Sequence, residues 1–198
     1  MKRTAVLIML LCCVTLVAPG CISRMIDEGV ERGLGPTAKA LPMEPKWPEE
    51  DTTFLAAYRN FELVLPVKSE FADTPKEFMD YFPVRFGEHL ASKDLPTGRD
   101  GKTLLVDVTI LAYQAVVSYH KAWGPTEEVV ARVELKDKDT GKIIGRAVCI
   151  GRTYQSIGLG HEWKAWGLCR AIINDWINEY YPKEGRKEGQ ENPPPTGK

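Results

Sequence analysis

Two of the five cysteines, together with three histidines, are the side chains that could support nucleophilic or metal chemistry. Cys149 and Cys169 each lie in a regular apolar stretch, whereas a reactive thiolate needs an adjacent base and access to solvent. No two histidines have the spacing of metal ligands; they are His89, His120 and His161. The sequence therefore predicts no catalytic residue and no metal site.

Two short motifs near residue 160 could suggest a metal or a nucleotide. His161-Glu162 begins like a helical zinc motif, but Ala165 stands where the second histidine is needed. Gly158-Leu159-Gly160 precedes a helical pattern, where exposed N–H groups can bind anions, but Trp163 occupies the position of the third glycine of a dinucleotide fingerprint. We interpret the glycines as a tight connection into the helix and expect no cofactor.

The N-terminus has the order of a secretory signal. Met1-Lys2-Arg3 places two positive charges before an apolar run from Ala5 to Ala18, and Gly20-Cys21 follows. The run of about 14 residues is shorter than the roughly 20 that a permanent membrane-spanning helix needs. We predict a removable signal peptide over residues 1–20.

The segment from Leu16 to Cys21 resembles the bacterial lipobox, in which a small residue precedes a cysteine. The resemblance implies diacylation of Cys21 and cleavage before it. Since Ile22 rather than aspartate follows, we expect the periplasmic face of the outer membrane more than the inner membrane. The alternatives are a secretory signal cleaved elsewhere and an uncleaved anchor.

Composition predicts one domain and excludes one class of partner. The chain contains 26 Lys and Arg residues against 27 Asp and Glu residues, which gives no electrostatic case for binding nucleic acid. Residues 21–54 are broken by glycines and prolines and predict a tether. Residues 55–181 carry the regular patterns of a single α/β domain. Residues 182–198 predict a disordered tail.

The regular patterns predict four strands and two helices. Alternating apolar residues indicate strands over residues 61–68, 103–113, 128–136 and 143–152. Apolar residues at helical spacing follow Thr74-Pro75, with a kink expected at Pro83, and recur over residues 162–181. The order β-α-β-β-β-α predicts an α+β fold: a mostly antiparallel four-stranded sheet with both helices packed on one face.

A disulfide between Cys149 and Cys169 is possible in an oxidising periplasm; the alternative is two reduced, buried thiols. The helical pattern places Cys169 toward the core. A three-residue loop in the hairpin at residues 137–142 would turn Cys149 to the same face, whereas a four-residue loop would bury Val148 instead. The sequence permits both registers.

The second face of the predicted sheet is a candidate interaction surface. Leu105, Leu111 and Tyr113 fall on that face, and the segment after them adds Tyr119 and Trp123. Aromatic side chains over a partly apolar sheet suit contact with a protein. The alternative is that Trp47 and the tether cover this surface within the monomer.

From about residue 61 to residue 181, the chain resembles the small α/β domain of bacterial envelope lipoproteins of the domain-of-unknown-function type. The local points of similarity are Thr74-Pro75-Lys76-Glu77-Phe78, Asp139-Thr140-Gly141-Lys142 and the glycine-rich entry to the last helix. A similar layout occurs in lipoprotein activators of penicillin-binding proteins and in curli-secretion lipoproteins. The resemblance implies an envelope accessory role and carries no catalytic residue.

The sequence thus predicts a lipid-anchored, noncatalytic envelope protein that binds another envelope component. Two alternatives remain: an enzyme with an unrecognised site, and a structural lipoprotein that self-associates. A convergent pocket of ionisable side chains would favour the enzyme, and symmetric pairing of strand edges would favour self-association.

Overall fold

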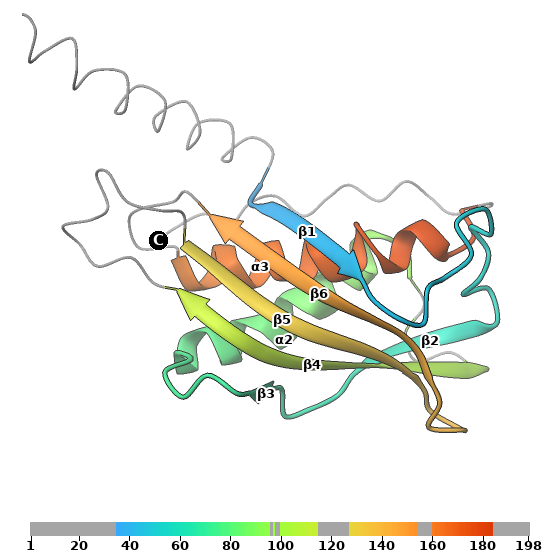
Figure 1. Ribbon diagram of the computed structural model, residues 1–198, viewed down its shortest axis with the longest axis horizontal. Helices are drawn as coiled ribbons and strands as arrows, with labels where there is room; N and C mark the ends of the chain where they lie inside the picture. Colours follow the sequence, from blue (N-terminus) through green and yellow to red (C-terminus); the bar gives the residue numbers. More distant parts are fainter. Residues whose placement is uncertain (1–34, 96, 98–99, 115–126, 154–159, 184–198) are drawn as a thin grey trace, which may run out of the picture.

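A mixed sheet with two helices on one face forms the framework of the protein (Figure 1). The computed structural model describes residues 35–95, 97, 100–114, 127–153 and 160–183. The strands are β1 (Thr37–Pro42), β2 (Tyr58–Leu63), β3 (Lys68–Ser69), β4 (Lys102–Gln114), β5 (Glu127–Asp137) and β6 (Ile143–Thr153). The helices are α2 (Lys76–Ser92), α3 (Gly160–Ile173) and the short 3-10 helix η2 (Ile177–Tyr180).

The sheet has the order β1-β6-β5-β4-β2, and β3 also pairs with β4. β1, β6, β5 and β4 are antiparallel neighbours, whereas β2 and β3 run parallel to β4. The α+β class and the two-helix layer agree with the sequence prediction, but the predicted four-stranded, mostly antiparallel sheet is corrected to a larger, mixed one. Because α2 connects β3 to β4, it forms the crossover that parallel pairing requires.

Strand β1 is a structural element inside the range predicted to be a tether. It pairs with β6 from Thr37 opposite Arg152 to Pro42 opposite Ala147. Gly35, just before β1, is buried with φ of +82°. A Cβ there would lie 2.4 Å from the Trp166 ring, so only glycine lets the chain approach α3 so closely. The folded domain therefore begins well before residue 55.

The β5–β6 hairpin turns the small residues of β6 toward the helices. Gly145 pairs with Leu135, and Cys149 pairs with Ala131. This is the core face that the three-residue loop predicts, although the ladder reaches it through an irregularity between Leu135 and Lys136. A Cβ on Gly151 would lie 2.4 Å from a backbone atom of α3. Glycine is needed there because the helix backbone lies directly on β6.

Helix α2 is continuous through Pro83, where the sequence predicts a kink or two short helices. Pro75 precedes the first helical residue, and the Thr74 hydroxyl donates to the Phe71 carbonyl (2.9 Å) instead of capping the helix. The predicted apolar stripe is confirmed, since its members are all buried: Phe78, Phe82, Phe86 and Leu90. This stripe attaches α2 to the rest of the core.

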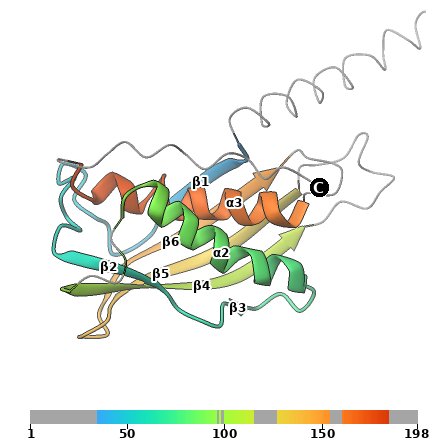
Figure 2. The ribbon, with the colours of Figure 1, turned by 180° about the vertical axis from the view of Figure 1, so that it is seen from behind.

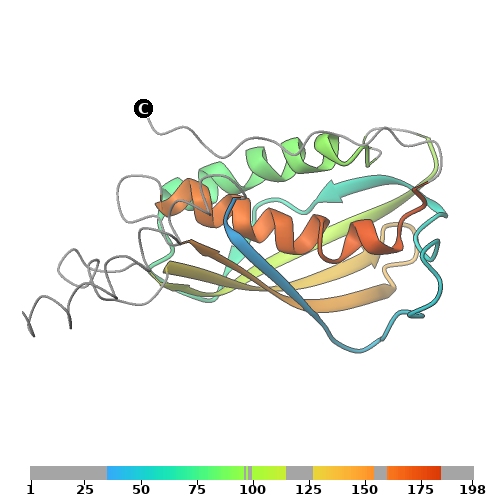
Figure 3. The ribbon, with the colours of Figure 1, turned by 90° about the horizontal axis from the view of Figure 1, so that it is seen from above.

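Helix α3 ends at Ile173, before the predicted end at residue 181, and η2 follows after a turn. Cys169, which the helical pattern places toward the core, is buried, and so are Trp166 and Trp176. Lys164 is buried as well, although a lysine is normally exposed. The reason is that α3 has neighbours on several sides, namely β6, β1, β5 and α2. Figures 2 and 3 show both helices on the same side of the sheet.

Candidate functional site

The predicted interaction surface is divided by the fold. Leu105 and Leu111 are half-buried, and Leu105 pairs with Lys136 on the sheet face that neither α2 nor α3 covers (Figure 3). Tyr113 is corrected to the opposite, core face, where it is buried. The register of β4 against β5 shifts between Ile110 and Ala112, and such a bulge reverses the facing of later residues. Tyr119 and Trp123 lie outside the described residues.

Ion pairs cover much of the open sheet face. Lys136 bonds to Asp107 at 2.7 Å and to Glu134 at 2.9 Å, and Arg146 reaches Glu134 at 2.8 Å. The bond from Lys136, with that from Arg146, holds the pKa of Glu134 below its usual value against the opposing effect of burial. Half-buried apolar side chains lie beside these pairs on the same face of β5 and β6; they are Val130, Val148 and Ile150. The face is therefore mixed in character rather than mainly apolar.

Trp47 does not cover this open face. Its indole stacks on Trp176 with ring centroids 5.0 Å apart, and its Nε1 donates to the Ile144 carbonyl (2.8 Å). The alternative that Trp47 and the tether cover the open face is therefore wrong for Trp47, which packs against the segment after α3; residues 21–34 of the tether lie outside the described residues.

A cluster of ionisable side chains converges where β4 ends and β5 and α3 begin. The Lys164 ammonium donates to Glu127 Oε2 (2.9 Å) and to the Gln114 carbonyl (3.2 Å). It also lies 4.0 Å from the centroid of the Tyr113 ring, a cation–π contact. The Tyr113 hydroxyl is hydrogen-bonded to Nδ1 of His161. Four ionisable side chains from three elements thus meet at one end of the sheet.

The environment of this cluster favours the neutral forms of Tyr113 and His161. Burial, and then the charges of Glu127 and Glu77, raise the pKa of Tyr113. Burial and the neighbouring Lys164 lower the pKa of His161. At pH 7 the phenol therefore keeps its proton, the imidazole is neutral, and the two groups share one hydrogen bond. The Lys164 side chain is 0% exposed. The cluster therefore contains one charge pair, Lys164 with Glu127, and one hydrogen bond between Tyr113 and His161.

Cys149 and Cys169 both face the core, but both are free thiols. The Sγ atom of Cys169 contacts the Phe82 carbonyl of α2 at 3.9 Å, so this thiol is directed toward the other helix, whereas Cys149 belongs to β6. Burial raises the pKa of both thiols, which keeps them protonated and poor nucleophiles. The possible disulfide is therefore corrected to two buried thiols.

The two histidines that the structure describes, His89 and His161, make different contacts. His89 is buried between α2 and Trp166, and its Nδ1 lies 3.1 Å from the Arg85 carbonyl. Because a carbonyl only accepts, Nδ1 carries the proton; the buried Nε2 has no hydrogen-bond partner. Burial lowers the pKa of His89 to about 4. His120 lies outside the described residues. Within those residues, no three His, Cys, Asp or Glu side chains are grouped to hold a metal ion.

Sequence reasoning missed two features of the molecule. The buried Lys164 gave no signal, because a lysine on a helical wheel is normally assigned to the solvent. The position of Trp47 against Trp176 was not predicted, since prolines and glycines surround Trp47 in the sequence.

Within the described part of the chain, no helix is long and apolar enough to span a bilayer.

The chain shows similarity to known proteins only at the level of structure. No protein-family model matches the sequence, and no curated protein matches it. PelC dodecamers from Paraburkholderia phytofirmans align with TM-scores of 0.46 and 0.48 at 9% identity, over 75% and 74% of this chain and all of theirs. A minor lipoprotein from Acinetobacter baumannii aligns with a TM-score of 0.33 at 17% identity, over 59% of this chain and 94% of its own. Similarities of this size assign neither a fold family nor a function.

Proposed function

We propose that this chain is a lipid-anchored, noncatalytic accessory lipoprotein of the bacterial envelope, and that its open sheet face binds another envelope component. One observation carries the proposal: α2 and α3 cover the same face of the sheet, and nothing in the described part of the chain covers the other face with a helix. That face combines half-buried apolar side chains with ion pairs, a mixture typical of interfaces between proteins that also exist apart.

The noncatalytic part of the proposal is supported by the chemistry of the buried groups. The two thiols are protonated within the core, and the Lys164 ammonium is enclosed by Glu127, Gln114 and Tyr113. Neither arrangement presents an activated nucleophile to solvent.

The lipid anchor rests on the sequence Leu16 to Cys21. The substitution Cys21→Ser should abolish incorporation of a labelled fatty acid. It should also release the protein from the membrane fraction, because acyl chains supply most of the membrane affinity. Labelling that persists in this variant would disprove the anchor without bearing on the sheet face.

The binding face can be tested by site-specific photo-crosslinking in intact cells. A photoreactive residue at Leu105 or Val148, on the open face, should give a discrete adduct with one envelope component. The same residue at Tyr81, exposed on α2 on the helical side, is the matched control. Equal adducts from both sides, or none from the open face, would contradict the proposal.

A further inference from the structure

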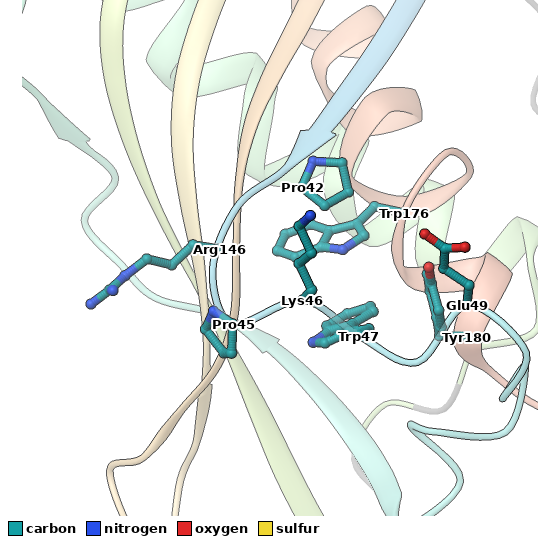
Figure 4. Close-up of a pocket in the computed structure, with 8 residues that line it drawn as sticks. All are labelled: Pro42, Pro45, Lys46, Trp47, Glu49, Arg146, Trp176 and Tyr180. Carbon is teal, nitrogen blue, oxygen red and sulfur yellow. The ribbon is translucent and has the colours of Figure 1, made fainter.

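A pocket lies between the segment that follows β1 and the end of the helical layer (Figure 4). Its volume is about 170 Å³. Three aromatic rings and two prolines line it together with charged side chains at its rim; the lining residues are Pro42, Pro45, Lys46, Trp47, Glu49, Arg146, Trp176 and Tyr180.

The aromatic wall of this pocket is held in place before anything binds. Trp47 and Trp176 are stacked at an interplanar angle of 20°, and Tyr180 meets Trp47 edge-on with centroids 4.7 Å apart. Trp47 is 8% exposed and Trp176 is 2% exposed, so these two rings form the floor. Pro42, Pro45 and the half-buried Tyr180 form the accessible walls.

The size of the pocket selects the kind of occupant. Sites for whole small molecules usually measure roughly 300–1,000 Å³, about twice this volume or more. A pocket of this size instead accommodates one or two side chains of an extended peptide. Prolyl rings suit an aromatic and proline-lined wall because they are rigid, carry no backbone N–H that would need a partner, and dock on aromatic rings in the polyproline II conformation.

We propose that the pocket binds the chain's own Pro193-Pro194-Pro195. Tyr180 lines the pocket, and the described chain continues from it to Lys183, so the tail starts at the pocket wall. Residues 184–192 can span at most roughly 30 Å, which is ample for a return to a wall this close. Since the tail is tethered, its effective concentration is in the millimolar range. Weak contacts by two prolyl rings therefore suffice.

The test uses the full chain and the indole N–H resonances of its tryptophans. Replacing Pro193, Pro194 and Pro195 together by serine should shift the indole resonances of Trp47 and Trp176, which line the pocket, and leave those of Trp163 and Trp166 unchanged. The matched control replaces three other tail residues by serine (E188S, Q190S and N192S), and should shift none. A synthetic peptide of residues 190–197, added to the proline variant at millimolar concentration, should restore the original positions.

A second variant changes the pocket instead of the tail. Tyr180→Ala should remove the response of Trp47 and Trp176 to the peptide, and Tyr81→Ala, on α2, should keep it. Unchanged resonances in the proline variant would overturn the proposal, as would equal shifts at Trp47, Trp176, Trp163 and Trp166. A shift that depends on protein concentration would also overturn it, because the occupant would then be the tail of a second copy.

Discussion

Gly145 leaves the space that the Trp47 indole occupies. An ideal Cβ built on Gly145 would lie 2.7 Å from Nε1 and from Cζ2 of that ring. The ring itself is fixed by its stack on Trp176 and by its bond to the Ile144 carbonyl. Trp47, in the segment after β1, thus packs against β6 at a position where only glycine leaves room for the indole ring.

Gly145→Ala should destabilise the protein by about 1–3 kcal/mol, because the added methyl group must displace a packed indole. The matched control is Gly87→Ala on α2, where a Cβ would meet nothing within 4 Å; this change should stabilise the protein by roughly 0.5–1 kcal/mol. Urea unfolding of both variants measures the difference. An unchanged midpoint for Gly145→Ala would mean that Trp47 does not pack as described.

Lys164→Met should cost about 3–5 kcal/mol, because it leaves the Glu127 carboxylate, 12% exposed, without its cation. Adding Glu127→Gln to that variant should recover part of the loss. The control is Lys183→Met, which removes an exposed pair with Glu179 at 3.9 Å and should change stability by less than about 1 kcal/mol. Similar losses in both single variants would contradict a buried pair.

His89 should make the protein sensitive to acid. Burial lowers its folded-state pKa from 6.5 to about 4, so between these values the unfolded chain binds the proton more tightly. The contribution of the neutral His89 to the free energy of unfolding is fully present above pH 6.5. It decreases by roughly 3 kcal/mol as the pH falls to about 4. The positive charges of Arg170, Lys93 and Arg85 act in the same direction.

His89→Gln should reduce the slope of unfolding free energy against pH between pH 6.5 and 4, whatever its effect on stability at pH 7. His161, whose pKa is also lowered, leaves a residual slope. An identical slope in the variant and the parent protein would disprove the role of His89.

Thiol counting checks the cysteine chemistry. Cys149 and Cys169 should not react with a thiol reagent in the native protein, because both are buried and protonated. Denatured protein from an oxidising compartment should show the thiols of Cys149 and Cys169 as reactive. A count of zero without reductant would mean that the two cysteines are bonded after all.

The hydrophobic patterns predicted the long elements well, because a buried face leaves a clear period in the sequence. The stripe of Phe78, Phe82 and Phe86 and the alternation along β5 are of this kind. The sequence left two registers open for the hairpin. In the observed register the small residues of β6 face inward, and α3 lies against Gly151.

The features that sequence missed depend on tertiary neighbours. β1 is short, and its inward residues are the alanines Ala38 and Ala40, which carry a weak apolar signal. Tyr113 faces the core instead of the predicted second face of the sheet, because β4 has a bulge that no local pattern indicates. The burial of Lys164 depends on Glu127, 37 residues away in the sequence. For these reasons the polar cluster could not be predicted.

The position of β1 has a mechanical consequence. In the proposed lipid-anchored protein, β1 is the described strand nearest to the anchor in the sequence. Gly35 and Pro36 precede it, and the Pro36 carbonyl accepts a bond from Arg170 (3.0 Å). A pull along the axis of β1 would load the ladder to β6 in shear, with all of its hydrogen bonds sharing the force. A pull across the strand would open that ladder one bond at a time. The pairing of β1 with β6 would therefore resist a pulling force best when that force is directed along β1.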